Sequence, residues 1–151
     1  MDSTNLFKQM SFWRSLIVGL LNEIPNDDGY KTPQGFNNNI LWNAGHVLVT
    51  YEEAFHNFNG ASKQLDDKFY SYFSTGTSPN DWNHDDLPTI TEVTNLLDQQ
   101  VKDFQKNWQE RLNEPLVKPL EFEKTVEELL FFLISHECYH LGVMTSMKKV
   151  I

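Results

Sequence analysis

Residues 125–149, TVEELLFFLISHECYHLGVMTSMKK, are the most informative stretch of the chain because they predict one long helix with a defined start. Thr125 and Glu128 have the spacing of a capping box, in which each side chain bonds to the backbone N–H of the other residue. We therefore predict a helix over Val126–Lys149. Within it, Leu129–Ile134 is apolar on every side, which is typical of a buried helix rather than of one with an exposed face.

Three further segments carry apolar side chains spaced mostly four and three residues apart, which keeps these side chains on one face of a helix. They are Thr4–Ile24, Asn37–Asn59 and Ile90–Leu112. Asn37 is a reasonable N-cap for the second segment, and Gly60 lies where a C-cap glycine belongs. The third segment begins with another capping box, formed by the Thr and Glu of the sequence TITE at positions 89–92.

Four long helices, each with an apolar stripe, predict an all-α protein with the architecture of a four-helix bundle. The first link, with a loop over Asn26–Gly35, is short, so the first two helices should be antiparallel. The second link, Ala61–Pro88, is long enough to cross the bundle, and we expect a short helix around Gln64–Phe73 within it. No repeat or linker divides the chain, so we expect a single domain over residues 1–151.

The composition limits the partners that the protein can have. Its formal net charge is −9, which disfavours binding to nucleic acid and to an anionic membrane surface. No uncharged apolar run approaches the roughly 20 residues that span a bilayer, and the N-terminus lacks the pattern of a signal peptide. Cys138 is the one cysteine, which fits a reducing compartment. We therefore expect a cytoplasmic protein.

Two histidines near the end of the chain are the first candidates for a functional site. His136 and His140 lie one helical turn apart, so their imidazoles point to one side of the helix and can share one metal ion. Two core histidines bonded to carbonyl or carboxylate groups would show the same spacing. His56 and His84 are expected at the surface, the first near the end of the second helix and the second in a polar loop.

The same string reads His-Glu-x-x-His, the motif by which zinc metalloproteases supply two ligands and a catalytic glutamate. Those enzymes usually take their third ligand from further along the chain. Only eleven residues follow His140, and none of them is His, Asp or Glu. An all-helical chain also offers no strand against which an extended peptide could bind. Both observations disfavour a protease.

His46 is the best candidate for a third ligand. It follows Gly45, whose cost to helix stability suggests the close approach of another group. However, His46 lies off the apolar stripe of the second helix, on a side that carries Asn39, Trp42, Thr50 and Glu53. Two interpretations remain open: an ordinary histidine of the polar face, or a ligand in a solvent-open cleft at the flank of the bundle.

The sequence resembles the DinB-like superfamily, which includes the YfiT-type metal-dependent enzymes. The resemblance rests on Asn43-Ala44-Gly45-His46 in the second helix and on the string from His136 to Gly142, H-E-C-Y-H-L-G, in the fourth. It implies that His46, His136 and His140 are metal ligands, that the helices run up-down-down-up, and that the protein is a homodimer. Val143 departs from the family, whose members often have Gln at this position.

Three imidazoles suit Zn or Ni best, with Co or Fe(II) as further candidates, and three protein ligands leave a coordination position open. Some members of the family resemble thiol S-transferases, so our leading interpretation is a metal-dependent enzyme that uses a low-molecular-weight thiol with a small-molecule substrate. A metal-dependent hydrolase and a non-catalytic metal- or ligand-binding dimer are the alternatives. Cys138 lies two residues from each ligand, on the opposite side of the helix, and is not that thiol. Residues expected near the ligands, in the pocket or just behind it, are Asn39, Trp42, Asn43, Thr50, Glu137 and Tyr139, although an exposed position is the commoner one for such a Glu.

Overall fold

The computed structural model describes residues 3–151, with side chains from Asn5 onward, and its regular elements are all helices. Met1 and Asp2, which belong to the predicted domain, lie outside the described residues. The long helices are α1 (Ser3–Glu23), α2 (Ile40–Asn59), α4 (Ile90–Trp108) and α5 (Val126–Lys148). Short helices complete the fold: η1 (Asn26–Tyr30), α3 (Asp67–Phe73) and η2 (Pro79–Asp81). The prediction of an all-α protein is confirmed.

Local signals place most helix ends correctly. Both predicted capping boxes are present, at the starts of α4 and α5, and Gly60 ends α2 in the left-handed conformation with φ 74°. The N-cap of α2 is Asn39 and not Asn37, because the Asn39 side chain accepts the hydrogen bond from the backbone N–H of Trp42 at 2.8 Å. In the links, the predicted short helix begins at Asp67, after Gln64, and the expected first loop contains the 3-10 helix η1.

Helix α4 ends at Trp108, four residues before the predicted end at Leu112. The apolar stripe misled the prediction because Leu112 is buried although it is not helical. The carbonyl group of Leu112 accepts a hydrogen bond from the backbone N–H of Glu127 at 2.9 Å, and thereby ties the loop to the first turn of α5. This tertiary contact is absent from any local pattern.

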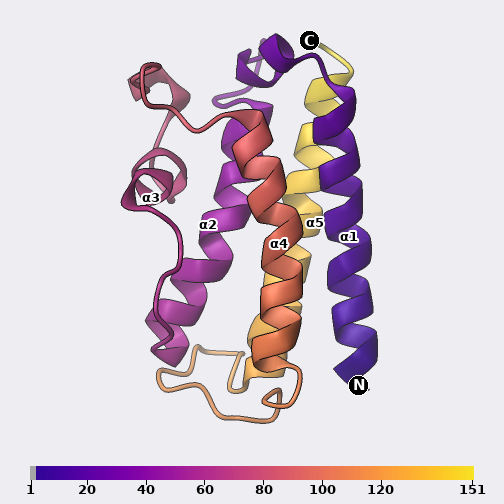
Figure 1. Cartoon of the computed structure of the whole chain (residues 1–151), viewed down its shortest axis with the longest axis vertical. Helices are drawn as coiled ribbons and strands as arrows, with labels where there is room; N and C mark the ends of the chain where they lie inside the picture. Colours follow the sequence, from indigo (N-terminus) through magenta and orange to yellow (C-terminus); the bar gives the residue numbers. More distant parts are fainter. Residues whose placement is uncertain (1–2) are drawn as a thin grey trace.

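The four long helices lie side by side, as Figure 1 shows. Helix α2 packs against α4 and α5, and α1 packs against the same two helices. The short helix α3 packs on the outer side of α2 (Figure 1), so α2 is covered on that side too. As a result, every residue from Ile40 to Val49 is buried. No helix in residues 3–151 is long and apolar enough to cross a membrane.

Helix α5 is not buried on every side, contrary to the prediction. Phe131 and Phe132 lie within its apolar run, yet 56% and 48% of their respective surfaces are exposed. Their neighbours Leu130 and Leu133 are fully buried. The run therefore contains a core stripe and an exposed apolar stripe, which periodicity alone cannot distinguish because both are hydrophobic.

Candidate metal centre

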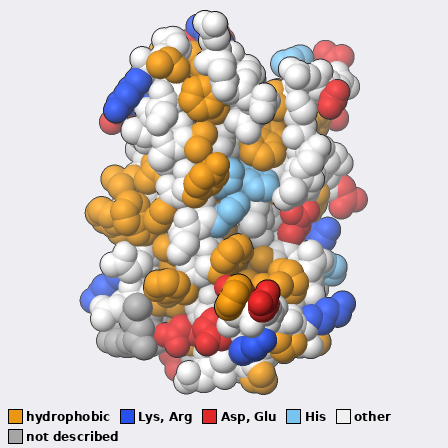
Figure 2. Space-filling model, turned by 180° about the vertical axis from the view of Figure 1, so that it is seen from behind, with side chains coloured by type: hydrophobic (Ala, Val, Ile, Leu, Met, Phe, Trp, Pro, Cys, Tyr) orange, Lys and Arg blue, Asp and Glu red, His pale blue; other side chains and the backbone are white. Residues whose placement is uncertain are grey.

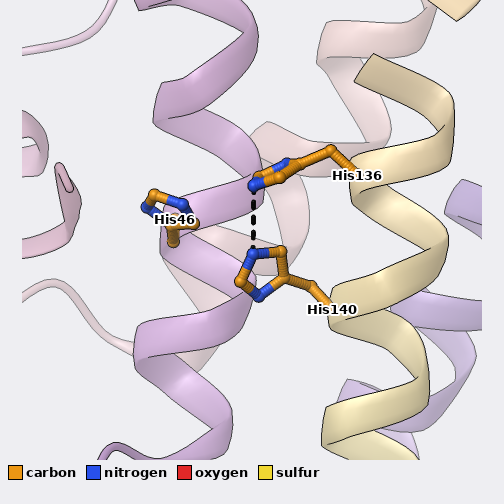
Figure 3. Close-up of side chains that lie close together, drawn as sticks. All are labelled: His46, His136 and His140. Carbon is orange, nitrogen blue, oxygen red and sulfur yellow. Dashed lines mark hydrogen bonds between the residues drawn. The ribbon is translucent and has the colours of Figure 1, made fainter. Parts of the chain in front are cut away.

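Three histidines from two helices meet on one side of the long helices. Each of His46 on α2 and His136 and His140 on α5 offers a ring nitrogen, and the three nitrogens lie within 4.8 Å of one another. Figure 3 shows the three imidazoles turned toward one another between the helices. The Nε2 atoms of His136 and His140 are 3.1 Å apart. In Figure 2, histidine side chains come to the surface near the middle of this face.

The imidazole of His140 is oriented by Asn43. Its Nδ1 lies 2.8 Å from the side-chain oxygen of Asn43, whose amide nitrogen donates to Asn38 and to the Asn39 carbonyl, each at 2.8 Å. Since the Asn43 oxygen is the acceptor, Nδ1 of His140 carries the proton and Nε2 presents its lone pair. Burial, together with the neighbouring histidines, lowers the pKa of His140 to about 3, so the ring is neutral at pH 7.

His46 is held in a comparable way by the link after α2. Its Nδ1 lies 2.8 Å from the backbone carbonyl oxygen of Phe73, which can only accept a hydrogen bond, so Nε2 is again the free nitrogen. The indole of Trp42 stacks on the ring at a centroid distance of 4.6 Å and an angle of 9°. Burial lowers the pKa of His46, although the Phe73 carbonyl opposes this shift.

Gly45 explains how Phe73 comes so close. A Cβ atom at this position would lie 2.4 Å from the ring of Phe73, which no side chain could tolerate without movement. The inference that Gly45 permits the close approach of another group is confirmed. His46 itself is only 6% exposed, so it is not an ordinary histidine of a solvated polar face.

His136 is the least constrained of the three. Its Nδ1 is buried and has no hydrogen-bond partner among the described residues. Burial, with a smaller contribution from His46, lowers its pKa to about 4. The Nε2 atoms of His136 and His140 are within hydrogen-bonding distance, so one proton lies between them, while Nε2 of His46 and Nε2 of His140 present lone pairs. A divalent transition metal that takes the place of this proton satisfies such a set of imidazole donors well. The residues present therefore fit a metal ion.

The other predicted pocket residues differ in how closely they approach the histidine rings. Asn43 and Trp42 contact the ring of a histidine, as described above, and Thr50 lies with its hydroxyl 3.4 Å from Nε2 of His46. Asn39 acts one step further away, by capping α2 and by accepting the bond from Asn43. Tyr139 is 68% exposed, and its ring meets that of His140 edge-on at 5.2 Å.

Glu137 was expected near the ligands, with an exposed position as the commoner alternative, and it is not exposed. It is fully buried and points into the core, where its carboxylate accepts hydrogen bonds from Arg14 and Tyr51. It belongs to no group of potential ligands with the histidines in the described part of the chain. Cys138 is partly buried, and its side chain lines a different surface, a groove between α1 and α5.

Sequence reasoning missed Arg14 and the Phe73 carbonyl. The sequence does indicate that Arg14 is buried, because it stands four residues after Met10 and three before Ile17, both of which belong to the apolar stripe of α1. A charged residue at such a position requires a buried partner. Nothing in the sequence indicates the role of the Phe73 carbonyl, because every residue has a backbone carbonyl.

Comparison with known proteins places the chain in a family. No curated protein matches the chain. A sequence model of the DinB superfamily matches residues 9–144, which include all three histidines of the site and most of each long helix. The chain therefore belongs to the DinB superfamily.

Proposed function

We propose that the protein is a metal-dependent enzyme in which His46, His136 and His140 bind a divalent transition metal, Zn or Ni in preference to Co or Fe(II). The observation that carries the proposal is the convergence of three ring nitrogens within 4.8 Å. Two of the rings are already turned by hydrogen bonds from Nδ1, which is how proteins usually orient metal-bound histidines. Low pKa values keep the rings of His136 and His140 neutral at pH 7, so that no second proton on either ring competes with the metal.

We further propose that the reaction is the transfer of a low-molecular-weight thiol to a small electrophilic substrate. When bound, the metal supplies Lewis-acid chemistry that lowers the pKa of a coordinated thiol. In such a transfer the thiol sulfur forms a bond to an electrophilic carbon, and the leaving group takes the electron pair of the bond that breaks. The chain contributes an oriented set of ligands, and Trp42 covers one face of His46 against water.

The surroundings of the histidines favour a thiol supplied from outside the protein. Among the described residues, no carboxylate or cysteine joins the histidines as a potential ligand. Cys138 lines the groove between α1 and α5, and burial raises its pKa, which disfavours a reactive thiolate. Glu137 is bonded to Arg14 and Tyr51 in the core, so it is not placed to act as the general base of a zinc protease.

The assembly and topology that we propose are a homodimer of up-down-down-up four-helix bundles. The long link over residues 61–88, which runs beside α2 in Figure 1, supports this helix order. Exposed apolar side chains on two adjacent helices support a dimer surface; they are Phe12, Leu16, Phe131 and Phe132. The single cysteine supports a location in the reducing cytoplasm.

The decisive experiment combines metal analysis with an activity screen. Purified protein is reconstituted with Zn, Ni, Co or Fe(II), its metal content is measured, and it is assayed with a panel of thiols and electrophiles and with a panel of esters and amides. His46→Gln, His136→Gln and His140→Gln should each lose metal and thiol transfer. His56→Gln and His84→Gln replace exposed histidines and should retain both.

Three results would contradict parts of the proposal. Less than about a tenth of an equivalent of metal after reconstitution would exclude the metal site. Turnover of esters or amides without thiol transfer would replace the transferase with a hydrolase. Full metal loading without turnover of either panel would favour a non-catalytic metal-binding dimer.

A further inference from the structure

A buried ion pair crosses the core next to the histidine site. Nε of Arg14 on α1 lies 2.6 Å from one carboxylate oxygen of Glu137 on α5, and Nη2 of Arg14 lies 3.2 Å from the other oxygen. The side chains are 2% and 0% exposed, respectively. One edge of the guanidinium, formed by Nε and Nη2, therefore meets the two oxygens of the carboxylate, an arrangement that fixes distance and direction together.

Two further side chains complete this network, which we call the core clamp: Arg14, Tyr51, Gln100 and Glu137. The Tyr51 hydroxyl on α2 donates to Glu137 at 2.8 Å. Nη1 of Arg14 donates to the side-chain oxygen of Gln100 on α4 at 3.1 Å and to the Leu97 carbonyl at 2.7 Å. The Gln100 amide donates in turn to the Leu48 carbonyl on α2 at 2.9 Å. The core clamp thus joins all four long helices.

Glu137 stands between the two histidines of α5 in sequence. At about 100° per residue, its side chain leaves the helix roughly 100° from that of His136 and roughly 60° from that of His140. When Glu137 points at Arg14, the two histidines must point toward α2, where His46 lies. A rotation of α5 about its axis would break the bonds of Glu137 and move both histidines away from His46.

Stability alone does not account for such a clamp. Desolvation of two buried charges offsets much of their attraction, and apolar replacements of similar volume are often equally stable. Apolar side chains, however, lack the directional bonds that select one rotation of a helix. In coiled coils, a single buried polar residue can specify the register in this way.

We propose that Arg14 and Glu137 are positioning residues of the metal site, which set the rotation of α5 so that His136 and His140 converge with His46. The inference rests on the proposed function, because it assigns the core clamp a role in metal binding. Glu137 acts through its neighbours and does not touch the metal. The family motif accounts for the histidines, whereas the core clamp accounts for their direction.

The test uses Co(II) as the probe, since its visible absorption reports the geometry of the ligands. Arg14→Met, Tyr51→Phe and Glu137→Met are combined to replace the charged part of the core clamp by apolar groups of similar size. Thr94→Val is the matched control, because it removes a buried hydroxyl from α4 that bonds only within its own helix. Helix content and urea unfolding show that each variant is folded before Co(II) is added.

We expect the triple variant to fold, to bind Co(II) about 10- to 100-fold more weakly, and to show an altered Co(II) spectrum, whereas Thr94→Val matches the wild type. A folded triple variant with wild-type affinity and spectrum would overturn the proposal. If the triple variant does not fold, Glu137→Gln is the deciding variant, because it keeps the shape of the side chain and removes the carboxylate that Nε and Nη2 of Arg14 both contact. Unchanged Co(II) affinity and spectrum in folded Glu137→Gln would then overturn the proposal, and weaker binding would support it.

The two proposals fail in distinguishable ways. If the wild-type protein itself binds no Co(II), the metal site is wrong and the role of the core clamp falls with it. If the wild type binds Co(II) and the folded clamp variants do so equally well, the metal site stands and only the positioning role is overturned.

Discussion

The ring of His140 on α5 is oriented by the side chain of Asn43 on α2, with 2.8 Å between Nδ1 and the amide oxygen. The two residues are 97 positions apart in the chain. Because the amide nitrogen of Asn43 is bonded to the Asn39 carbonyl, the oxygen cannot exchange places with it without losing this bond. Helix α2 thus determines which nitrogen of an α5 histidine is free to bind.

Replacement of Asn43 should weaken metal binding more than it weakens folding. Asn43→Ala removes the acceptor for Nδ1 of His140, so the ring is no longer held in one tautomer and direction. Loss of such an outer partner typically costs about 10- to 100-fold in metal affinity, measured here by competition with a chromophoric chelator. Asn43→Asp keeps an acceptor and should bind metal much more tightly than Asn43→Ala. Equal affinities for the two variants would show that the hydrogen bond is unimportant.

Gly45→Ala should disturb the site through Phe73. The new Cβ would overlap the Phe73 ring at 2.4 Å, so α3 must move, and the Phe73 carbonyl that holds His46 moves with it. Overpacking of this kind costs about 1–3 kcal/mol in the free energy of unfolding. We expect that loss in urea unfolding of the metal-free protein, together with weaker metal binding.

Gly142→Ala provides the matched control for this prediction. Gly142 is also helical, but a Cβ there meets no atom within 4 Å. Since Ala is favoured over Gly inside a helix by up to about 1 kcal/mol, this variant should be as stable as the wild type or more so. A Gly45→Ala protein that is stabilised like Gly142→Ala would contradict the close contact with Phe73.

Acid should destabilise the metal-free protein through the histidines. The pKa values of His136 and His140, about 4 and about 3, lie below the value near 6.5 expected in the unfolded chain. As the pH falls from 6.5 toward 4, the unfolded chain therefore binds protons that the folded protein does not, and the free energy of unfolding decreases. Above pH 6.5 this contribution to the pH dependence vanishes.

The double variant His136→Gln and His140→Gln isolates this effect from the carboxylates. It should lose less unfolding free energy than the wild type between pH 6.5 and 4, as measured by urea unfolding at a series of pH values. Parallel profiles for the two proteins would mean that the histidines titrate alike in the folded and unfolded states.

Features that depend on neighbours in the chain could be predicted from the sequence. The apolar stripes located the long helices, and the capping boxes located the starts of α4 and α5, because both signals act within one or two turns. The spacing of His136 and His140 showed that they share one side of a helix. Asn43 and Trp42 were placed near the site through the motif around His46.

Features that depend on distant contacts could not be predicted in the same way. Helix α4 ends early because the loop after it is tied to Glu127 at the start of α5. Glu137 is buried rather than exposed because Arg14, 123 positions away, supplies a counter-charge. The Phe73 carbonyl reaches His46 only because α3 folds back onto α2, and a backbone group leaves no trace in the residue type.

The ion pair between Arg14 and Glu137 leads to a prediction about stability that is independent of metal. Arg14→Met leaves the Glu137 carboxylate buried without its cation, and the Tyr51 hydroxyl alone cannot replace the charge. Removal of one partner from a buried pair costs about 3–5 kcal/mol. We expect a decrease of this size in the free energy of unfolding of the metal-free protein at pH 7.

Lys102→Met serves as the comparison, because Lys102 forms an ion pair with Asp98 on the surface of α4, with both side chains more than half exposed. Water already solvates that carboxylate, so loss of Lys102 should cost no more than about 1 kcal/mol. If Arg14→Met costs as little as Lys102→Met, the prediction is wrong, because the buried Glu137 carboxylate then does not depend on Arg14 for its counter-charge.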